Sequence, residues 1–275
     1  MNILCIGDIV GKPGREAVEG LLAGLKKEFE IDFAVVNAEN AAGGAGLTSR
    51  IADELLKAGC DVLTLGDHVW DQKDLEGYLD KTDAVLRPAN FPDGTPGRGW
   101  CVKKLSSGQS VGVVSLLGRV FMRYHLECPF RALERIVAEI RRETPVVIVD
   151  MHAEATSEKV ALGHFIDGKV SAVVGTHTHI QTADEKILPR GTAYITDLGM
   201  TGPYDSVIGQ GKEDIIKRFL TSRPVKFQVA ENDIVVHGAV INVDGRSGKA
   251  LNITRIQRAF AAGGLAPKEA EKSRS

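Results

Sequence analysis

The sequence has no long hydrophobic run, no strong excess of either charge and no secretion signal. No apolar stretch approaches the roughly 20 residues that a membrane-spanning helix needs. Residues 1–8 contain neither a basic segment nor a small-residue cleavage site. The formal net charge of -2 argues against long nucleic acid or an anionic membrane surface as partners, but is compatible with a small anionic ligand. We therefore expect a soluble cytoplasmic protein that binds neither membranes nor long nucleic acid.

Closely spaced cysteine pairs are also missing. The four cysteines form no CxxC motif, and three of them adjoin apolar residues. This pattern favours reduced thiols in the core over disulfides or a zinc knuckle. The residues concerned are Cys5, Cys60, Cys101 and Cys128.

Two common nucleotide-binding motifs are absent as well. The glycine-rich segment 7–15 lacks both the G-x-G-x-x-G spacing and the G-K-[ST] ending, so a Rossmann cofactor site is not expected. A second small-residue loop, 41–46, has two compatible interpretations. It can be a tight turn into a helix capped by Thr48 or Ser49. It can also leave room beside Glu39 for a substrate phosphate held by backbone N–H groups.

The pattern that is present indicates an α/β protein. A chain of 275 residues is long enough to bury a large core. Runs that are nearly continuous in apolar residues predict strands buried on both faces, and amphipathic segments separate several of them. Strands are expected at Asn2–Ile6, Phe33–Asn37, Val62–Leu65, Val111–Leu117, Val146–Val149 and Ala172–Val174. Helices are expected at Arg15–Phe29, Ser49–Ala58 and Phe130–Arg142.

The pattern changes near residue 225 to short alternating strands, which we expect to add antiparallel strands to the sheet system. They are Lys226–Ala230, Ile234–Asn242 and Leu251–Gln257. The second is expected to break at Gly238, and Asp244-Gly245 predicts a turn. No domain boundary is evident, so we expect one domain over residues 1–262 and a disordered tail over 263–275.

The most informative motif is a histidine doublet, His177 and His179, at the end of an apolar run. Residues i and i+2 of a strand point to one face, so both rings can serve one metal ion or two adjacent ions. Potential partners follow other apolar runs. These partners are Asp8, Glu39, Asn40, Asp67, His68 and His152. Ligands gather at the carboxyl ends of strands in open α/β sheets, and five such strand ends can share one edge of a sheet.

Each partner alone has an ordinary structural explanation. Asp8 could form a turn or cap a helix, and His152 could be a hydrogen-bonded core residue. Together, carboxylates and neutral imidazoles suit iron, manganese or zinc, and no cysteine lies near them in the sequence. Their number exceeds the needs of one structural ion. It suits two ions about 3.5–4 Å apart that share a bridging carboxylate and clamp a phosphoryl group.

The series of motifs resembles the ordered blocks of the calcineurin-like metallophosphoesterases, and more narrowly the YmdB family. The resemblance extends from the first strand to at least residues 199–203. The longest matching blocks are GDIVG from Gly7, NAENAAGG from Asn37, DMHAEATSEK from Asp150 and GTHTHIQTAD from Gly175. It implies a four-layer αββα metallophosphoesterase sandwich with mixed sheets, two metal ions, either iron (Fe2+/Fe3+) or Mn2+, and hydrolysis of 2',3'-cyclic nucleotides to 3'-nucleotides.

The resemblance also implies roles for individual residues. Glu39 would bridge two ions, and a metal-bound hydroxide would attack phosphorus in line with the 2'-oxygen. His68 is the candidate general acid, although it could instead orient residue 67. The first ion would be bound by Asp8, Asn40 and His179, and the second by Asp67, His152 and His177.

Position 67 departs from the family pattern, which reads Gly-Asn-His where this chain has Gly66-Asp67-His68. A carboxylate in place of an amide adds one negative charge to the site. It should hold the second cation more tightly and reduce its Lewis acidity. We therefore expect a retained dinuclear site with an altered activity profile.

Other residues and functions have weaker support. His125, His164 and His237 lie outside the motif blocks, and Arg119 and Phe121 could line a base pocket or be ordinary surface and core residues. Two other functions remain open: a phosphomonoesterase, and a regulatory protein that binds metal and nucleotide with little turnover. A homo-oligomer is also possible.

Overall fold

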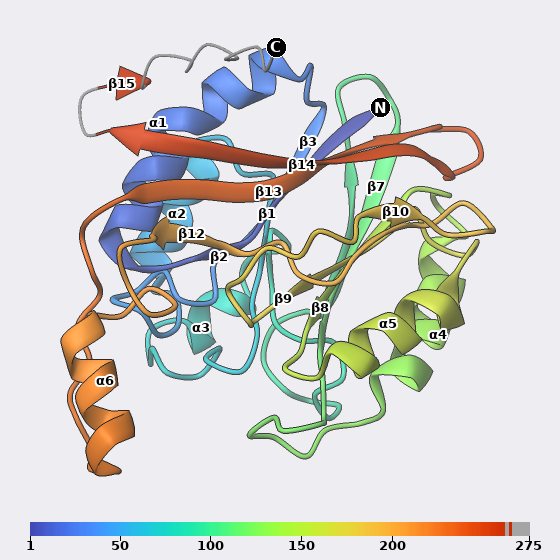
Figure 1. Cartoon of the computed structure of the whole chain (residues 1–275). Coiled ribbons are helices and arrows are strands. Elements are labelled where there is room, and N and C mark those ends of the chain that lie inside the picture. The colour runs from blue at the N-terminus through green and yellow to red at the C-terminus, as the bar shows by residue number, and fades with distance from the viewer. Residues whose placement is uncertain (262–263, 266–275) are drawn as a thin grey trace.

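Two β-sheets lie face to face at the centre of the computed structural model, and helices cover both outer faces (Figure 1). The structure describes residues 1–261 and 264–265. The four layers follow the order α, β, β, α. This arrangement confirms the predicted fold class.

The larger sheet carries the first half of the site. It contains β1 (Asn2–Ile6), β2 (Asp8–Ile9), β3 (Phe33–Asn37), β4 (Val62–Thr64), β5 (Val85–Leu86), β12 (Met200–Pro203), β13 (Ile234–Val243), β14 (Ala250–Ala261) and β15 (Gly264–Leu265). Its main order is β15-β14-β13-β1-β3-β4-β5, and β2 and β12 pair beside this path. Strands β1, β3, β4 and β5 are parallel, whereas β13 runs antiparallel to β1.

The smaller sheet carries the second half of the site. It contains β6 (Trp100–Lys104), β7 (Ser110–Leu117), β8 (Val147–His152), β9 (Ala172–Thr176), β10 (Lys186–Ile187) and β11 (Ala193–Ile195). Its order is β10-β11-β9-β8-β7-β6. The four central strands are parallel, and β6 and β10 are antiparallel edges. Both sheets are therefore mixed, as the family resemblance implied.

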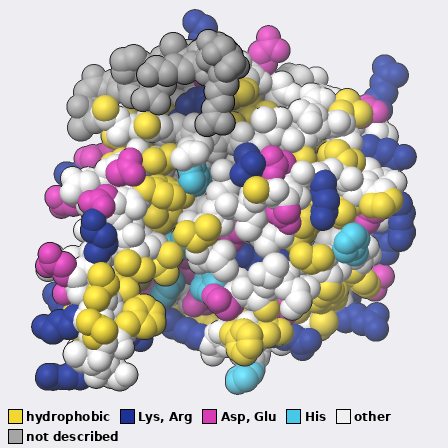
Figure 2. All heavy atoms as spheres, in the orientation of Figure 1, with side chains coloured by type: hydrophobic (Ala, Val, Ile, Leu, Met, Phe, Trp, Pro, Cys, Tyr) yellow, Lys and Arg dark blue, Asp and Glu magenta, His cyan; other side chains and the backbone are white. Residues whose placement is uncertain are grey.

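The helices bury apolar faces on the sheets. They are α1 (Gly11–Glu28), α2 (Ser49–Lys57), α3 (Glu76–Leu79), α4 (Pro129–Ile140), α5 (Thr156–Ile166) and α6 (Lys212–Thr221). Side chains of α1 and α2 pack on the larger sheet, and those of α4 and α5 pack on the smaller one. A third apolar cluster, which includes Ile3 and Ile148, fills the space between the sheets. Helix α6 extends from the body (Figure 1), and hydrophobic side chains gather over it in Figure 2.

Two local predictions about the carboxyl-terminal region are wrong, and a third lies mostly outside the described residues. Residues Lys226–Ala230 form no regular strand, and only Val229 makes an isolated bridge. Strand β13 continues through Gly238 without a break. A Cβ at Gly238 would lie 2.3 Å from the carbonyl oxygen of Cys5, so glycine permits close strand pairing there. The predicted tail lies outside the described residues, except that Gly264–Leu265 form β15.

Other local predictions are confirmed. Thr48 caps α2 by accepting a hydrogen bond from the Ile51 N–H at 3.3 Å. The turn after β13 is closed by the Gly248 N–H, which donates to the Asp244 carbonyl. None of the cysteines forms a disulfide in the described part of the chain, and Cys5, Cys60 and Cys101 are buried. Within residues 1–261 and 264–265, no helix has the length and hydrophobicity needed to cross a membrane.

Candidate functional site

The predicted site residues converge at one edge of the sandwich, where parallel strands of both sheets end. Asp8 begins β2, which follows β1, and His152 ends β8. The other members follow β3, β4 and β9; they are Glu39, Asn40, Asp67, His68, His177 and His179. The strand ends therefore belong to two facing sheets, whereas the motif spacing had pointed to the edge of one sheet.

The first donor group consists of His152, Asp67 and His177. The Nε2 of His152 lies 3.3 Å from Asp67 Oδ1 and 3.1 Å from His177 Nδ1. The distance between Asp67 Oδ1 and His177 Nδ1 is 3.6 Å. These three residues are close enough to bind one metal ion.

A second group forms around His179. Its Nε2 lies 3.1 Å from Asn40 Nδ2 and 3.9 Å from Asp8 Oδ1. Rotation of the Asn40 amide by 180° would present Oδ1, a metal-binding atom, at this point. Asp8 Oδ1 is also 3.7 Å from His152 Nδ1, so the two groups are adjacent.

The Glu39 carboxylate is completely buried beside the first group, and its charge also interacts with that of Asp8 in the second. It accepts hydrogen bonds from the backbone N–H groups of Gly66 and His68, which fix its orientation. Its Oε1 is 3.8 Å from His152 Nε2. Gly66 makes this approach possible, because a Cβ there would lie 2.1 Å from His152 Cδ2.

A buried hydrogen-bond network sets the tautomer of His152. Thr176 Oγ1 donates its only proton to Asp150 Oδ1 at 2.7 Å, so it can only accept from His152 Nδ1 at 2.9 Å. The Nε2 lone pair consequently faces Asp67 and His177. Asp150 also accepts from Asn37 and Thr64, and this set was not foreseen from the sequence. Such partners orient metal-binding imidazoles in proteins.

The electrostatics of the cluster fit cations. Burial and the nearby Asp197 raise the pKa of Asp8, and burial and the Asp67 charge raise that of Glu39. Burial also opposes ionisation of Asp67, but the neighbouring imidazoles, His152 foremost, outweigh it and the pKa of Asp67 is lowered. Asp8 Oδ1 and Asp67 Oδ1 are buried without a hydrogen-bond partner among the described residues. Bound cations would supply the missing interactions.

Burial favours the neutral form of His152, His177 and His179, which leaves their lone pairs available. Burial lowers the pKa of His152 to about 3, and it lowers the pKa of His177 and His179. The Nδ1 of His179 lies 2.9 Å from the Ile208 carbonyl, so this nitrogen carries the proton and Nε2 faces the cluster. This donor set fits divalent metal ions.

The doublet loop has an uncommon backbone conformation. The φ angles of His177 and His179 are 98° and 66°. Positive φ angles in non-glycine residues cost on the order of 1–3 kcal/mol each. The His177 N–H donates to Asp8 Oδ2 at 3.1 Å, which ties the loop to the larger sheet.

His68 is placed differently from the other histidines. Its side chain is 33% exposed, and its Nδ1 lies 2.7 Å from Asp71 Oδ2. Asp71 Oδ1 in turn lies 3.2 Å from the Arg123 guanidinium. The imidazole Nε2, on the opposite side of the ring, is therefore available to a ligand. Asp71 was not predicted as a site residue, although its spacing three residues after His68 was a usable signal.

With this geometry established, comparisons with known proteins identify the family. The model of the YmdB-like protein family matches residues 4–256. The chain belongs to the YmdB-like family. It is 50% identical over 256 residues to the 2',3'-cyclic-nucleotide 2'-phosphodiesterase of Bacillus subtilis, covering 93% of this chain and 96% of the relative.

Two solved structures resemble this YmdB-like protein closely. A hypothetical protein from Thermus thermophilus matches with a TM-score of 0.88 and 42% identity, covering 95% of this chain and all of that one (100%). A novel phosphatase from Mycoplasma pneumoniae matches with a TM-score of 0.88 and 34% identity, covering 94% and 93%. Together with the family match, these relatives confirm the predicted enzyme class, a hydrolase of the metallophosphoesterase type.

The remaining histidines lie outside the cluster in the YmdB-like fold. His125 and His164 are exposed, and His237 is buried with its Nδ1 2.5 Å from the Tyr204 hydroxyl. Phe121 is 88% exposed. The backbone N–H of Arg119 donates to the Glu158 carboxylate, which anchors this segment to α5.

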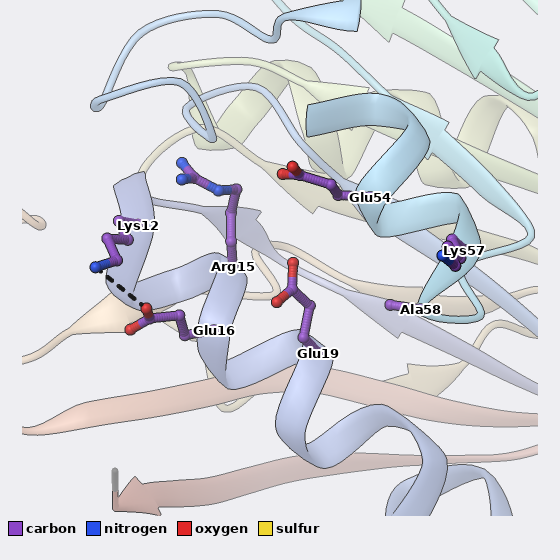
Figure 3. Close-up of a pocket in the computed structure, with 7 residues that line it drawn as sticks. All are labelled: Lys12, Arg15, Glu16, Glu19, Glu54, Lys57 and Ala58. Atoms are coloured by element: carbon purple, nitrogen blue, oxygen red, sulfur yellow. Dashed lines mark ion pairs between the residues drawn. The ribbon is translucent and has the colours of Figure 1, made fainter. Parts of the chain in front are cut away.

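A groove between α1 and α2 is lined by none of the predicted metal ligands, and Figure 3 shows the side chains that line it. It has a volume of about 510 Å³ and is lined by Lys12, Arg15, Glu16, Glu19, Glu54, Lys57 and Ala58. Cations and anions face each other there, and Lys12 pairs with Glu16 at 3.4 Å. Arg15 donates to the Ala41 carbonyl at 2.5 Å. The groove thus supports the loop after Asn40 and offers no excess charge for a phosphate.

Proposed function

We propose that this protein is a dinuclear metal-dependent phosphodiesterase that hydrolyses 2',3'-cyclic nucleotides to 3'-nucleotides. The observation that carries the proposal is the pair of adjacent donor groups that meet beside the Glu39 carboxylate. The name of the B. subtilis relative supports the substrate class. We propose iron or Mn2+ as the metal, because mixed carboxylate, amide and imidazole donors suit these ions.

The donor groups correspond to two ion sites. Asp8, Asn40 and His179 would hold one ion, whereas Asp67, His152 and His177 would hold the other. Glu39 would contact both, because its Oε1 lies 3.8 Å from His152 Nε2 and its charge interacts with that of Asp8. Such ions, when bound, lower the pKa of water and neutralise charge on phosphoryl oxygens.

His68 is suited to the proton transfer that the reaction requires. Hydrolysis adds the hydroxyl of water to phosphorus and breaks the bond to the 2'-oxygen, so the phosphate stays on the 3'-oxygen. The departing 2'-oxygen needs a proton. His68 Nε2 would supply it, since Asp71 holds Nδ1 at 2.7 Å and the side chain is open to solvent on one side.

Phosphomonoesterase activity is the second candidate. The Mycoplasma pneumoniae structure is described as a phosphatase, and a relative from the same organism, 36% identical, is named a putative phosphatase/phosphodiesterase. The same ions could clamp a terminal phosphate.

A substrate panel distinguishes these activities. Protein loaded anaerobically with Fe2+ or Mn2+ is incubated with 2',3'-cyclic AMP, 3',5'-cyclic AMP and p-nitrophenyl phosphate. We expect preferential conversion of 2',3'-cyclic AMP to 3'-AMP, identified by chromatography. Preferred hydrolysis of p-nitrophenyl phosphate would favour the phosphatase. Ligand-dependent melting without product would identify a regulatory binding protein.

The bridging role of Glu39 is tested by Glu39→Gln. We expect kcat/KM to fall by more than about 100-fold, beyond the 10–100-fold typical of groups that only orient a ligand. Glu54→Gln, at a half-buried position outside the ligand cluster, is the matched control, and it should leave activity unchanged. Full activity in Glu39→Gln would refute the assignment.

A further inference from the structure

Two buried residues outside the ligand set form an ion pair next to the loop of the histidine doublet. Lys159 Nζ lies 2.7 Å from Asp197 Oδ2, and the side chains are 1% and 0% exposed. Lys159 belongs to α5 and is the last residue of the motif DMHAEATSEK. Of this motif, the proposed function assigns a metal-binding role only to His152. Asp197 lies between β11 and β12. Burying a charge pair costs free energy, because both groups lose their contact with water. Such a pair in the protein interior therefore indicates a specific role.

The hydrogen bonds of this pair reach the backbone around both histidines. Lys159 Nζ donates to the Thr176 carbonyl, the residue before His177, at 2.7 Å. Asp197 Oδ2 accepts from the N–H of Thr178 at 3.1 Å and from its Oγ1 at 2.7 Å. Thr178 lies between the two histidines in sequence. The ion pair therefore fixes the loop on both sides of His177.

Close packing brings the pair to this position. A Cβ at Gly175 would lie 1.8 Å from the Thr196 carbonyl oxygen and 2.9 Å from Lys159 Cδ. The absence of a side chain at Gly175 thus lets the Asp197 segment lie against the end of β9. The Gly199 N–H donates to Asp197 Oδ1 at 2.8 Å, so both oxygens of the carboxylate accept hydrogen bonds.

We propose that Lys159 and Asp197 are positioning residues that preset His177 and His179 for metal binding. This inference rests on the proposed function. A loop with positive φ angles at both histidines does not hold this shape by local preference alone. The ion pair supplies directional bonds from two different elements. Because the histidines belong to different donor groups, loss of these bonds weakens both ion sites.

Thr178→Val is the decisive variant, since it removes the hydroxyl bond and preserves the shape and the ion pair. Chelator-treated full-length protein is titrated with MnCl2 by calorimetry. We expect Mn2+ affinity to fall roughly 10-fold at both sites, the lower end of effects seen for groups that orient ligands. The Tm of the metal-free protein should remain near that of the wild type. Thr178→Ser retains the hydroxyl and should restore the affinity.

Lys159→Met tests the ion pair itself and should weaken Mn2+ binding by up to about 100-fold. If this variant does not fold, Thr178→Val decides. Glu158→Gln is the matched control, because Glu158 lies in the same helical turn but anchors Arg119; its Mn2+ affinity should match the wild type. Wild-type affinity in Thr178→Val would overturn the inference and leave the proposed function intact. Failure of the wild type to bind Mn2+ or Fe2+ would overturn both.

Discussion

At the scale of single residues, Asp67 is the most unusual feature of the site. Its Oδ1 is buried between His152 and His177, 3.3 Å and 3.6 Å away. Burial opposes its ionisation, but the contact with these imidazoles lowers the pKa of Asp67. An ionised carboxylate at this position adds a negative charge to the proposed second ion site that the amide of asparagine would not.

Asp67→Asn should weaken metal binding at one site and make the bound cation a stronger Lewis acid. We expect the acid limb of the pH–rate profile to move to lower pH by about one unit, because removal of one nearby charge has effects of this size. Metal analysis and pH–rate profiles with 2',3'-cyclic AMP measure both effects. If metal content, rate and pH optimum all stay the same, the electrostatic argument is wrong.

At the scale of elements, the site depends on how closely the ends of β4 and β8 approach. Gly66 follows β4, and the His152 ring at the end of β8 occupies the space where a side chain would be. The Gly66 N–H also donates to Glu39. A single glycine therefore sets the spacing of three segments from two sheets.

Gly66→Ala should displace His152. We expect a loss of about 1–3 kcal/mol in the free energy of unfolding from overpacking and at least a 10-fold loss of Mn2+ affinity. Denaturant unfolding and calorimetric titration measure these effects. Gly24→Ala in α1 is the control, since a Cβ there would meet none of the described atoms within 4 Å. It should retain metal binding and gain up to about 1 kcal/mol of stability. Unchanged metal binding in Gly66→Ala would disprove the steric argument.

For the molecule as a whole, the proposed ions would link the two sheets. Asp8, Glu39 and Asp67 come from the larger sheet, whereas His152 and His177 come from the smaller one. Buried carboxylates without cations also repel one another, and this repulsion adds to burial in raising the pKa of Glu39. Metal binding should therefore stabilise the folded state of the entire domain.

Removal of metal by a chelator should lower the Tm, and Mn2+ should restore it. The expected stabilisation is about 2.7 kcal/mol when free Mn2+ is 100 times its Kd. Differential scanning calorimetry over a range of MnCl2 concentrations measures it. Glu39→Gln should show a smaller shift. A Tm that does not depend on Mn2+ in the wild-type protein would exclude a metal link between the sheets.

The sequence alone determined the alternation of strands and helices and the order of ligand types at the strand ends. Apolar periodicity is a local property, so β1, β3 and α1 could be predicted within a few residues. Helix α5 was missed because its buried face contains the polar residues Glu158 and Lys159 and Phe165 is exposed, which removes the amphipathic signal. Motif resemblance supplied the candidate ligands, because each motif is short and continuous.

How these residues face one another became clear only from the packing of the two sheets. The meeting of ligands from both sheets, the Asp71 contact to His68 and the Lys159–Asp197 pair depend on approaches between separate elements. The bond from the His177 N–H to Asp8 spans 169 residues of sequence. Contacts of this kind arise from sheet packing and close glycine approaches, and no local pattern in the chain encodes them.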